Sequence, residues 1–400
     1  MSIAWSVLKF ERRIKKMLLV SHMIWRNRIS QYPKIVTDFE LNFASKLGVK
    51  HAISTNNGTS GLEAAFFALG IGPGDEIISP SYTIQATFGA ALTQGISVKF
   101  ADIDQDTLTV SASSVESKIS KKTKAIVVVH VWGNPANMEA LLTLSKKHGI
   151  PIIEDCSHCH GASYNGLALG SLGDISVFSL QGGKPVAGGE GGIVVTSSDE
   201  LADRVLAYCH QGRRISGTLN EPIKSEFFPY TGFGRKCRAH PLAIAMAQID
   251  LKLLDRHNKL HNRAWTKFSD LTKKTKVFKI QRQQPKGKMG GFFLGAAATI
   301  ITENLSPDQV YKILRKHNVK IDRRRHTPYH KMPHIYDIEY RKSHTKGLQI
   351  MPSEAPNLPQ TEHALSHVIF FPLAQFFSAK GMRRWRSAIS DLEAQNSSCL

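Results

Sequence analysis

The sequence predicts an α/β protein built around a mostly parallel sheet, and three observations support this prediction. Short β-branched runs alternate with helical patterns from residue 50 onward, as in strands joined by crossover helices. One of these runs, Lys124–Val131, is continuously apolar, which is typical of a strand buried on both faces. The chain has 400 residues, enough for two or three domains at roughly 150 residues each. Function is then expected at loops that follow the strands.

The predicted elements follow one another along the first half of the chain. Short apolar runs indicate seven strands, and apolar residues three and four positions apart indicate helices between them. In one such helix Leu62, Ala65 and Leu69 share a face. The strands are His51–Ser54, Glu76–Ser79, Ser97–Ala101, Lys124–Val131, Ile150–Asp155, Asp174–Ser179 and Gly192–Thr196. The helices are Ser60–Leu69, Ile84–Leu92, Ser113–Ile119 and Met138–His148.

A second, smaller α+β unit is predicted after a long helical pattern over residues 241–268. Lys273–Gly291 is polar, basic and contains Gly and Pro, so we expect a loop or insertion there. A strand over Phe292–Ile301 and a helix over Ser306–His317 follow, with Ser306 as the helix cap. The predicted organisation is an N-terminal helical segment (1–30), a large domain (31–255) and a small C-terminal domain (256–400).

Composition restricts the class of protein. With 42% hydrophobic and 21% charged residues, the chain is globular rather than disordered, collagen-like or coiled-coil. No apolar run approaches the ~20 residues of a membrane helix, and Met17–Val20 is far shorter than a signal-peptide core of about 7–15 residues. Five cysteines are an odd number, normal for a reducing compartment. We expect a soluble cytoplasmic protein without a membrane partner, whose N-terminal helix turns Leu8, Ile14 and Leu18 inward.

The net charge of +20 raises the hypothesis of nucleic-acid binding. The cations are spread out, are densest in Lys9–Lys16 and Lys273–Lys288, and lack the interleaved aromatic residues of a base-stacking platform. A solvated basic surface is the simpler interpretation, and an attraction for nucleotides or other polyphosphates is the alternative. Nucleic acid is therefore not the expected partner.

The segment Cys156-Ser157-His158-Cys159-His160 has the C-x-x-C-H pattern of covalent haem attachment, and its second histidine raises zinc as an alternative. Neither hypothesis has support elsewhere in the chain. No signal peptide is evident, and no second Cys/His pair stands at a zinc-finger spacing. We therefore expect no metal site.

Four separated segments together indicate a different chemistry. Gly58, Thr59 and Ser60 lie between a strand and a helix, where backbone N–H groups and the helix dipole can bind a phosphate. Asp155 ends a buried strand. Ser179 and Lys184 follow another strand and precede the Gly-rich loop 188–192, in which backbone can approach a flat ligand closely. A phosphate cup, a carboxylate and an amine are the groups that pyridoxal phosphate (PLP) requires.

At these residues the chain resembles the DegT/StrS-type (DegT/DnrJ/EryC/StrS) sugar aminotransferases, which belong to the fold-type-I class of PLP-dependent transferases. The resemblance extends over nearly the whole chain, and the order and spacing of its pieces make it specific. The segments that carry it include Leu69–Ile77, Glu154-Asp155, His160–Ala162, Gly170–Asp174, Glu190–Gly192 and His326–His330.

The resemblance implies a role for each matching residue. Lys184 would bind the cofactor covalently and transfer a proton during the reaction, and Asp155 would pair with the pyridine nitrogen. The phosphate would be held by Ser179, Gly58, Thr59 and Ser60. His158 stands where family members carry Gln or His near the cofactor's phenolic oxygen.

The chain departs from the family pattern at two cofactor positions. Ile84 replaces the usual aromatic residue that stacks on the cofactor ring, so an apolar contact or Tyr82 would serve instead. Lys236 stands where Asn is usual in a segment that reaches the partner subunit's cofactor phosphate, so it is either a phosphate contact or a surface residue. His326, Tyr329 and His330 match a small-domain motif and are candidate substrate contacts.

The resemblance implies transamination, because relatives that catalyse dehydration carry a histidine where this chain has Lys184. The expected donor is glutamate or glutamine, and the expected acceptor is a keto-sugar, most plausibly linked to a nucleotide. A keto-cyclitol (inosose-type) acceptor is the alternative within the family. A non-catalytic regulator that binds PLP or nucleic acid is the alternative outside it. Family members are homodimers, so a homodimer is expected.

Overall fold

The computed structural model describes residues 2–30, 33–210, 234–292, 294–322, 328–337, 339, 351 and 354–397. Its centre is a seven-stranded sheet with the order β1-β9-β8-β5-β4-β2-β3. Six of its strands run in one direction and β9 runs antiparallel to both of its neighbours, so the sheet is mostly parallel, as predicted. The strands are β1 (His51–Thr55), β2 (Glu76–Pro80), β3 (Ser97–Ala101), β4 (Thr123–Val129), β5 (Ile152–Asp155), β8 (Ile175–Ser179) and β9 (Gly192–Thr196).

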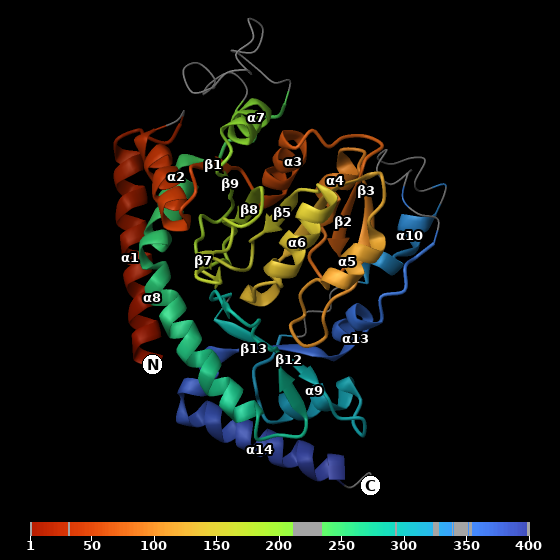
Figure 1. Ribbon diagram of the computed structural model, residues 1–400. Helices are drawn as coiled ribbons and strands as arrows, with labels where there is room; N and C mark the ends of the chain where they lie inside the picture. Colours follow the sequence, from red (N-terminus) through yellow and green to blue (C-terminus); the bar gives the residue numbers. More distant parts are fainter. Residues whose placement is uncertain are drawn as a thin grey trace, which may run out of the picture.

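Helices cover both faces of this sheet (Figure 1). One face packs against α2, α5, α6 and α8 through Ile78, Ile126 and Ile152. The other packs against α3, α4 and α7 through Ile77 and Ile153. Because successive strand residues point to opposite faces, such runs must be apolar throughout. These helices are α2 (Lys34–Leu47), α3 (Gly58–Ala68), α4 (Ala86–Thr93), α5 (Ala112–Lys118), α6 (Met138–His148), α7 (Asp199–Cys209) and α8 (Pro241–Thr272).

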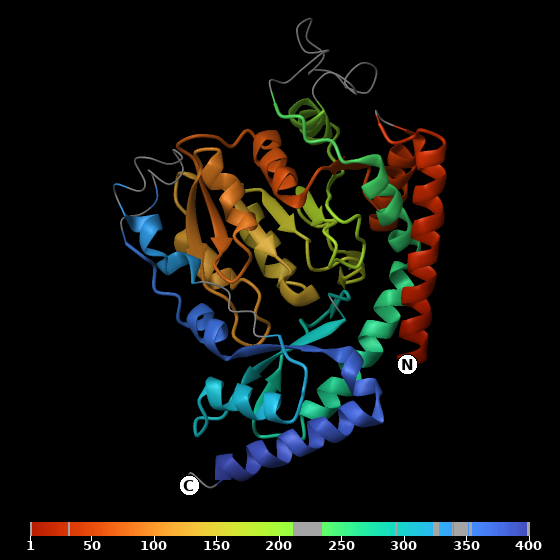
Figure 2. The same cartoon turned by 180° about the vertical axis from the view of Figure 1, so that it is seen from behind.

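Helix α8 runs from the large sheet to a second, three-stranded antiparallel sheet with the order β10-β12-β13. Figure 2 shows this small sheet and α14 together at the end of the molecule away from α7. Its core includes Phe268 of α8 and Trp385 of α14. The elements are β10 (Phe278–Ile280), β12 (Gly295–Ile300), α9 (Pro307–Lys316), α13 (Pro359–His367), β13 (Val368–Pro372) and α14 (Ala379–Ser397). Helix α10 (Pro333–Tyr336) instead packs through Ile335 against the core of the large sheet. A third small sheet joins β6 (Ser163–Tyr164), β7 (Leu167–Ala168) and β11 (Gly287–Lys288).

The structure confirms the seven predicted strands of the large sheet, and Ser306 caps α9 in a capping box with Gln309. The segment Lys273–Gly291, predicted as a loop or insertion, instead contains the short strands β10 and β11. These strands are only 3 and 2 residues long, too short to give a periodic pattern, and β11 pairs with β6 far earlier in the chain. The predicted domain bounds stay a prediction.

The N-terminal segment forms the predicted helix, α1 (Ser2–Trp25), which lies along α8 at the outside of the molecule (Figure 1). Leu8 is buried, as predicted, but Leu18 is 60% exposed and the prediction for it is wrong. The reason is that apolar residues lie on both faces of α1, so periodicity alone could not identify the packed face. No described helix is long and apolar enough to cross a membrane.

Candidate active site

The carboxyl ends of β5 and β8 lie side by side at one edge of the large sheet. The strands pair in parallel with Asp155 opposite Val177, so Asp155 and Ser179 both stand at this edge. Helix α3 begins at the same edge. A Cβ atom on Gly58 would stand only 3.3 Å from the Cβ of Ser179. The start of the helix and the Ser179 side chain therefore form one cradle.

The first turn of α3 offers backbone donors to this cradle. Asn57 caps the helix, and its side chain accepts a hydrogen bond from the Ser60 N–H at 2.8 Å. The N–H groups of Gly58 and Thr59 precede the first intrahelical hydrogen bond, so they and the helix dipole can bind an anion. The Ser60 N–H is already engaged, so Ser60 can contribute only its hydroxyl group.

Asp155 is buried and held in a fixed orientation. Its Oδ2 accepts a hydrogen bond from the Thr87 hydroxyl at 2.8 Å, and its Oδ1 accepts one from the Ser157 N–H at 3.1 Å. The Thr87 hydroxyl also lies 2.8 Å from that of Thr83. A carboxylate has about four lone-pair directions, so these two donors leave it able to accept a further hydrogen bond.

Lys184 lies half-buried in the loop after β8. Its Nζ is 5.0 Å from the centre of the Phe292 ring, and that ring lies against His158 with centroids 3.9 Å apart. The Trp132 N–H donates a hydrogen bond of 3.4 Å to Nδ1 of His158. Trp132 has φ +58°, a rare conformation for a bulky residue and one that clusters at functional sites. Phe292 therefore brings the second half of the chain into contact with Lys184 and His158.

The two residues considered for ring stacking differ in exposure. Tyr82 is 2% exposed, and its hydroxyl accepts a hydrogen bond from Nε1 of Trp132 at 3.2 Å. Burial raises the pKa of Tyr82 well above its ordinary value. Ile84, by contrast, is 52% exposed just before α4. Of the two, Ile84 is the side chain free to contact a ligand, whereas Tyr82 is packed in the core.

The remaining predicted site residues lie in other segments. Lys236 is exposed next to Cys237, whose carbonyl accepts a hydrogen bond of 2.7 Å from the Asn56 N–H beside the start of α3. Tyr329 packs edge-on against Phe88. His330 is buried and lies 2.7 Å from Ser81 Oγ and 3.3 Å from a Glu362 carboxylate oxygen. Burial lowers the pKa of His330. His326 lies outside the described residues.

The C-x-x-C-H segment is a buried turn rather than an exposed ligand set. Cys156 and Cys159 are fully buried, and the Cys159 thiol donates a hydrogen bond of 3.6 Å to the Cys156 carbonyl. Burial raises the pKa of both thiols, which disfavours the thiolate that a metal ion binds. Cys156 does lie close to His130 and Glu154, but those two side chains are engaged with each other.

Glu154 lies in a saturated hydrogen-bond network behind the candidate site. It accepts hydrogen bonds from Nε2 of His130 at 3.0 Å, from the Ser176 hydroxyl at 3.2 Å and from three backbone N–H groups. His130 accepts a hydrogen bond at Nδ1 from the Ala136 N–H, which leaves its proton on Nε2. Burial alone would raise the pKa of Glu154, but the hydrogen bonds outweigh it and lower that pKa.

Sequence reasoning missed three residues of this region: Thr87, Trp132 and Phe292. Thr87 follows Thr83 by four residues, and this spacing gives only a weak signal. Trp132 and Phe292 give none, because their positions depend on an unusual backbone angle and on a contact between distant segments.

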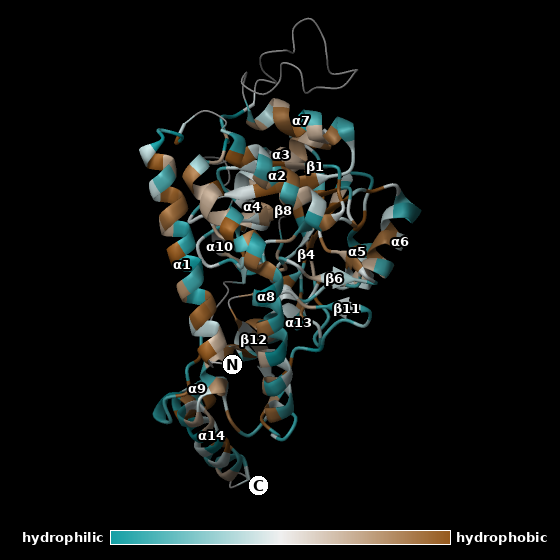
Figure 3. Cartoon of the chain, turned by 90° about the vertical axis from the view of Figure 1, so that its left-hand side faces the viewer, coloured by the Kyte–Doolittle hydropathy of each residue, from teal (hydrophilic) through white to brown (hydrophobic). Residues whose placement is uncertain are grey.

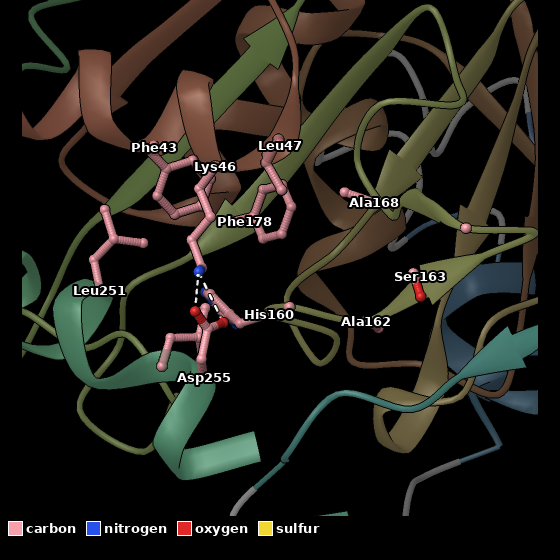
Figure 4. A pocket seen from close by; sticks show the side chains of 13 residues that line it. Phe43, Lys46, Leu47, His160, Ala162, Ser163, Ala168, Phe178, Leu251 and Asp255 are labelled. Carbon is pink, nitrogen blue, oxygen red and sulfur yellow. Dashed lines mark hydrogen bonds and ion pairs between the residues drawn. The ribbon is translucent and has the colours of Figure 1, made fainter. Parts of the chain in front are cut away.

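A separate cavity of about 170 Å³ lies between α2, α8 and the loop after β5 (Figure 4). Lys46 and Asp255 form an ion pair of 2.8 Å at its wall. His160 lines it almost fully buried, and neither ring nitrogen makes a hydrogen bond, although the Ser179 carbonyl lies nearby. Burial, and then the charge of Lys184, lower the pKa of His160 to about 3. Among the predicted site residues that the structure describes, none lines this cavity.

The residues at the edge of the large sheet fit PLP. Any side chain at position 58 would crowd Ser179, so glycine keeps the backbone donors of the cradle accessible to a phosphate. Asp155 is a buried carboxylate with spare acceptor capacity, which suits a protonated ring nitrogen. Lys184 provides a primary amine on the loop that follows Ser179.

Solved structures identify the class of fold. The aminotransferase from Psychrobacter cryohalolentis superposes with a TM-score of 0.80 at 22% identity, and the match covers 96% of this chain and 97% of that one. The protein therefore has the fold of the fold-type-I PLP-dependent transferases.

The chain belongs to the DegT/DnrJ/EryC1/StrS aminotransferase family, whose sequence profile matches residues 12–378. It is 38% identical over 222 residues to GDP-perosamine synthase of Caulobacter vibrioides, a match that covers 56% of this chain and 58% of the relative. It is 41% identical over 179 residues to L-glutamine:2-deoxy-scyllo-inosose aminotransferase of Streptomyces paromomycinus, covering 45% and 42%. The chain thus spans about half the length of these curated relatives.

Proposed function

We propose that this protein is a PLP-dependent aminotransferase that transfers an amino group from glutamate or glutamine to a keto-sugar, most plausibly a nucleotide-linked one. The observation that carries the proposal is the meeting of the Gly58–Ser179 cradle and Asp155 at one edge of the large sheet, with Lys184 on the loop that follows Ser179. Family membership supports it independently.

Each side chain has a defined task in this proposal. The N–H groups of Gly58 and Thr59 and the Ser179 hydroxyl bind the phosphate. The Asp155 carboxylate, held by Thr87, accepts a hydrogen bond from the protonated ring nitrogen. When bound, the cofactor withdraws electrons from the α-carbon of the amino donor and carries its nitrogen to the acceptor.

The other residues orient the reactants and exclude water. The Lys184 amine removes the proton from the donor's α-carbon and delivers it to the cofactor's reactive carbon. His158 is held between Trp132 and Phe292 and would lie beside the cofactor ring, while Ile84 would supply an apolar contact to it. The expected assembly is a homodimer, in which Lys236 would reach the phosphate bound by the partner subunit.

The names of two relatives and the net charge of the chain indicate the class of amino acceptor. A relative named for GDP-perosamine synthesis favours a nucleotide-linked keto-sugar, and a net charge of +20 suits a diphosphate substrate. The relative named for an inosose supports a keto-cyclitol as the second candidate.

The absorption spectrum of the purified protein with PLP tests the proposal. We expect a visible band from the lysine-bound cofactor that fades on addition of glutamate or glutamine, and no such band in Lys184→Ala. Single turnovers with a nucleotide-linked keto-sugar or a keto-cyclitol then restore the band only for the true acceptor class. Absence of any band in the unmodified protein would contradict the cofactor assignment.

A further inference from the structure

Helix α1 carries an apolar stripe on its outward face, interrupted by the exposed Ser21. Residues at the spacing of three and four that defines one helix face lie in this stripe, which runs along about 36 Å of helix. Figure 3 shows apolar segments along the outer side of α1, where no described element covers them. The exposed apolar side chains of the stripe are Ile3, Val7, Phe10, Met17, Leu18, Ile24 and Trp25.

The opposite face of α1 already holds the helix on the protein. Leu8 and Met23 are buried, and Arg12 and Lys16 both pair with the buried carboxylate of Asp250 on α8. The orientation of α1 is therefore fixed by ion pairs, and the stripe is not available to the core of the same chain.

The exposed aromatic residues mark the stripe as more than ordinary surface. Phe10 is 68% exposed and Trp25 is 87% exposed. Contiguous apolar patches of this kind usually mark an interaction site. Phe and Trp on one face of a helix, with cations on its flanks, are characteristic of helices that lie in a membrane interface.

The charge of residues 1–30 indicates which kind of partner covers the stripe. Residues 1–30 contain seven Lys and Arg but a single acid, Glu11. Three of these cations are already in ion pairs, Lys15 with Glu11 and both Arg12 and Lys16 with Asp250. The other four are Lys9, Arg13, Arg26 and Arg28. Arg13 on α1 is exposed beside the stripe, and Arg26 is exposed just after the end of the helix. A second copy of α1 would bring the same excess of cations to the contact, whereas an anionic lipid surface would neutralise it.

We propose that α1 docks this protein onto anionic lipid bilayers, with the stripe from Ile3 to Trp25 inserted at the level of the headgroups. The helix lies parallel to the membrane and does not span it, so the absence of a membrane-crossing helix is compatible with this role. The proposal differs from the expectation of no membrane partner, which stays a prediction. The proposal is independent of the catalytic assignment, because no residue of the stripe belongs to the candidate active site.

Vesicle co-sedimentation of the full chain tests this docking. The vesicles contain phosphatidylcholine with about one third phosphatidylglycerol, or phosphatidylcholine alone, at about 0.1 M salt. We expect binding to the anionic vesicles, little binding to the neutral ones, and at least a tenfold weaker partition for the triple variant Phe10→Gln, Met17→Gln, Leu18→Gln.

A matched control carries the same change at exposed apolar residues elsewhere: Leu41→Gln, Leu167→Gln and Ile301→Gln. This control should bind as the unmodified protein does, and both variants should keep their thermal stability because the altered side chains are exposed. No binding to anionic vesicles, or equal weakening in both variants, overturns the proposal. So does a result in which the α1 variant changes only the oligomeric state, since the stripe would then contact a second copy.

Discussion

Glu154 and Asp155 are consecutive residues at the end of β5, yet they lie in two chemically different regions. Because successive strand residues point to opposite faces, Glu154 enters the closed network behind the sheet and Asp155 faces the cradle of the candidate site. Both carboxylates are buried. Glu154 accepts five hydrogen bonds, whereas Asp155 accepts two.

The number of accepted hydrogen bonds distinguishes a carboxylate that stabilises the fold from one that can bind a ligand. A buried charge is tolerated when its hydrogen bonds are complete, and the network of Glu154 meets that condition without any ligand. Asp155 is oriented but incompletely bonded, so its remaining acceptor capacity is available to a bound molecule. Burial alone does not distinguish the two residues, but the number of donors does.

The largest expected effect is on chemistry at Asp155. Asp155→Asn should slow the single-turnover reaction with an amino donor by about 100-fold or more at saturating cofactor, because a neutral amide no longer stabilises the protonated ring nitrogen. Its free energy of unfolding should change by less than about 1 kcal/mol. Stopped-flow absorbance and urea denaturation measure the two quantities. A variant that keeps its rate would remove Asp155 from the proposed mechanism.

Glu154→Gln should show the opposite pattern. The amide nitrogen would face N–H donors, so we expect the free energy of unfolding to fall by about 3 kcal/mol, with a single-turnover rate close to that of the unmodified protein in the folded fraction. The exposed Glu190 provides the control, and Glu190→Gln should change stability by less than about 0.5 kcal/mol. Equal stability of the two variants would refute a structural role for Glu154.

Thr87 offers a smaller and more selective test of how Asp155 is positioned. Thr87→Val removes the hydroxyl that donates to Oδ2 and should lower the single-turnover rate about tenfold, the equivalent of one hydrogen bond to a charged group. Thr87→Ser keeps the hydroxyl and should restore the rate to within about twofold. Failure of serine to restore it would mean that Thr87 acts through packing instead.

The smallest expected effect is a pH dependence of stability at His160, behind the site. The pKa of His160 is lowered to about 3 in the folded protein, so the unfolded chain binds its proton first. The lowered pKa of His160 therefore adds to the free energy of unfolding fully above pH ~6.5, and this addition is lost as the pH falls toward ~3. We expect the unmodified protein to lose about 1 kcal/mol more than His160→Gln between pH 7.5 and 5.5, measured by urea denaturation. Parallel curves would contradict this assignment.

Much of the large sheet could be predicted because its signals are local. Buried parallel strands must be apolar on both faces, and the helices between them repeat their apolar residues every three or four positions. The predicted strand Ser97–Ala101 and helix Met138–His148 match the observed bounds. The strands within Lys273–Gly291 could not be predicted, since they are only 3 and 2 residues long and β11 pairs with the distant β6.

The candidate site likewise contains residues that could be predicted from the sequence and residues that could not. The positions of Gly58, Asp155, Ser179 and Lys184 follow from motifs at strand ends, where a parallel sheet collects its functional loops. The placement of Trp132 and Phe292 against His158 depends on contacts between segments far apart in the chain.

The sequence by itself determined the α/β class, the seven strands of the large sheet with the four helices between them, and the residue types that indicate PLP chemistry, because each rests on periodicity or on a short motif. Only the tertiary structure decided that Glu154 is saturated while Asp155 can still accept a hydrogen bond, and that the stripe of α1 faces outward. Hydrogen-bond saturation and exposure depend on which distant atoms meet a side chain, and the one-dimensional pattern does not contain that information.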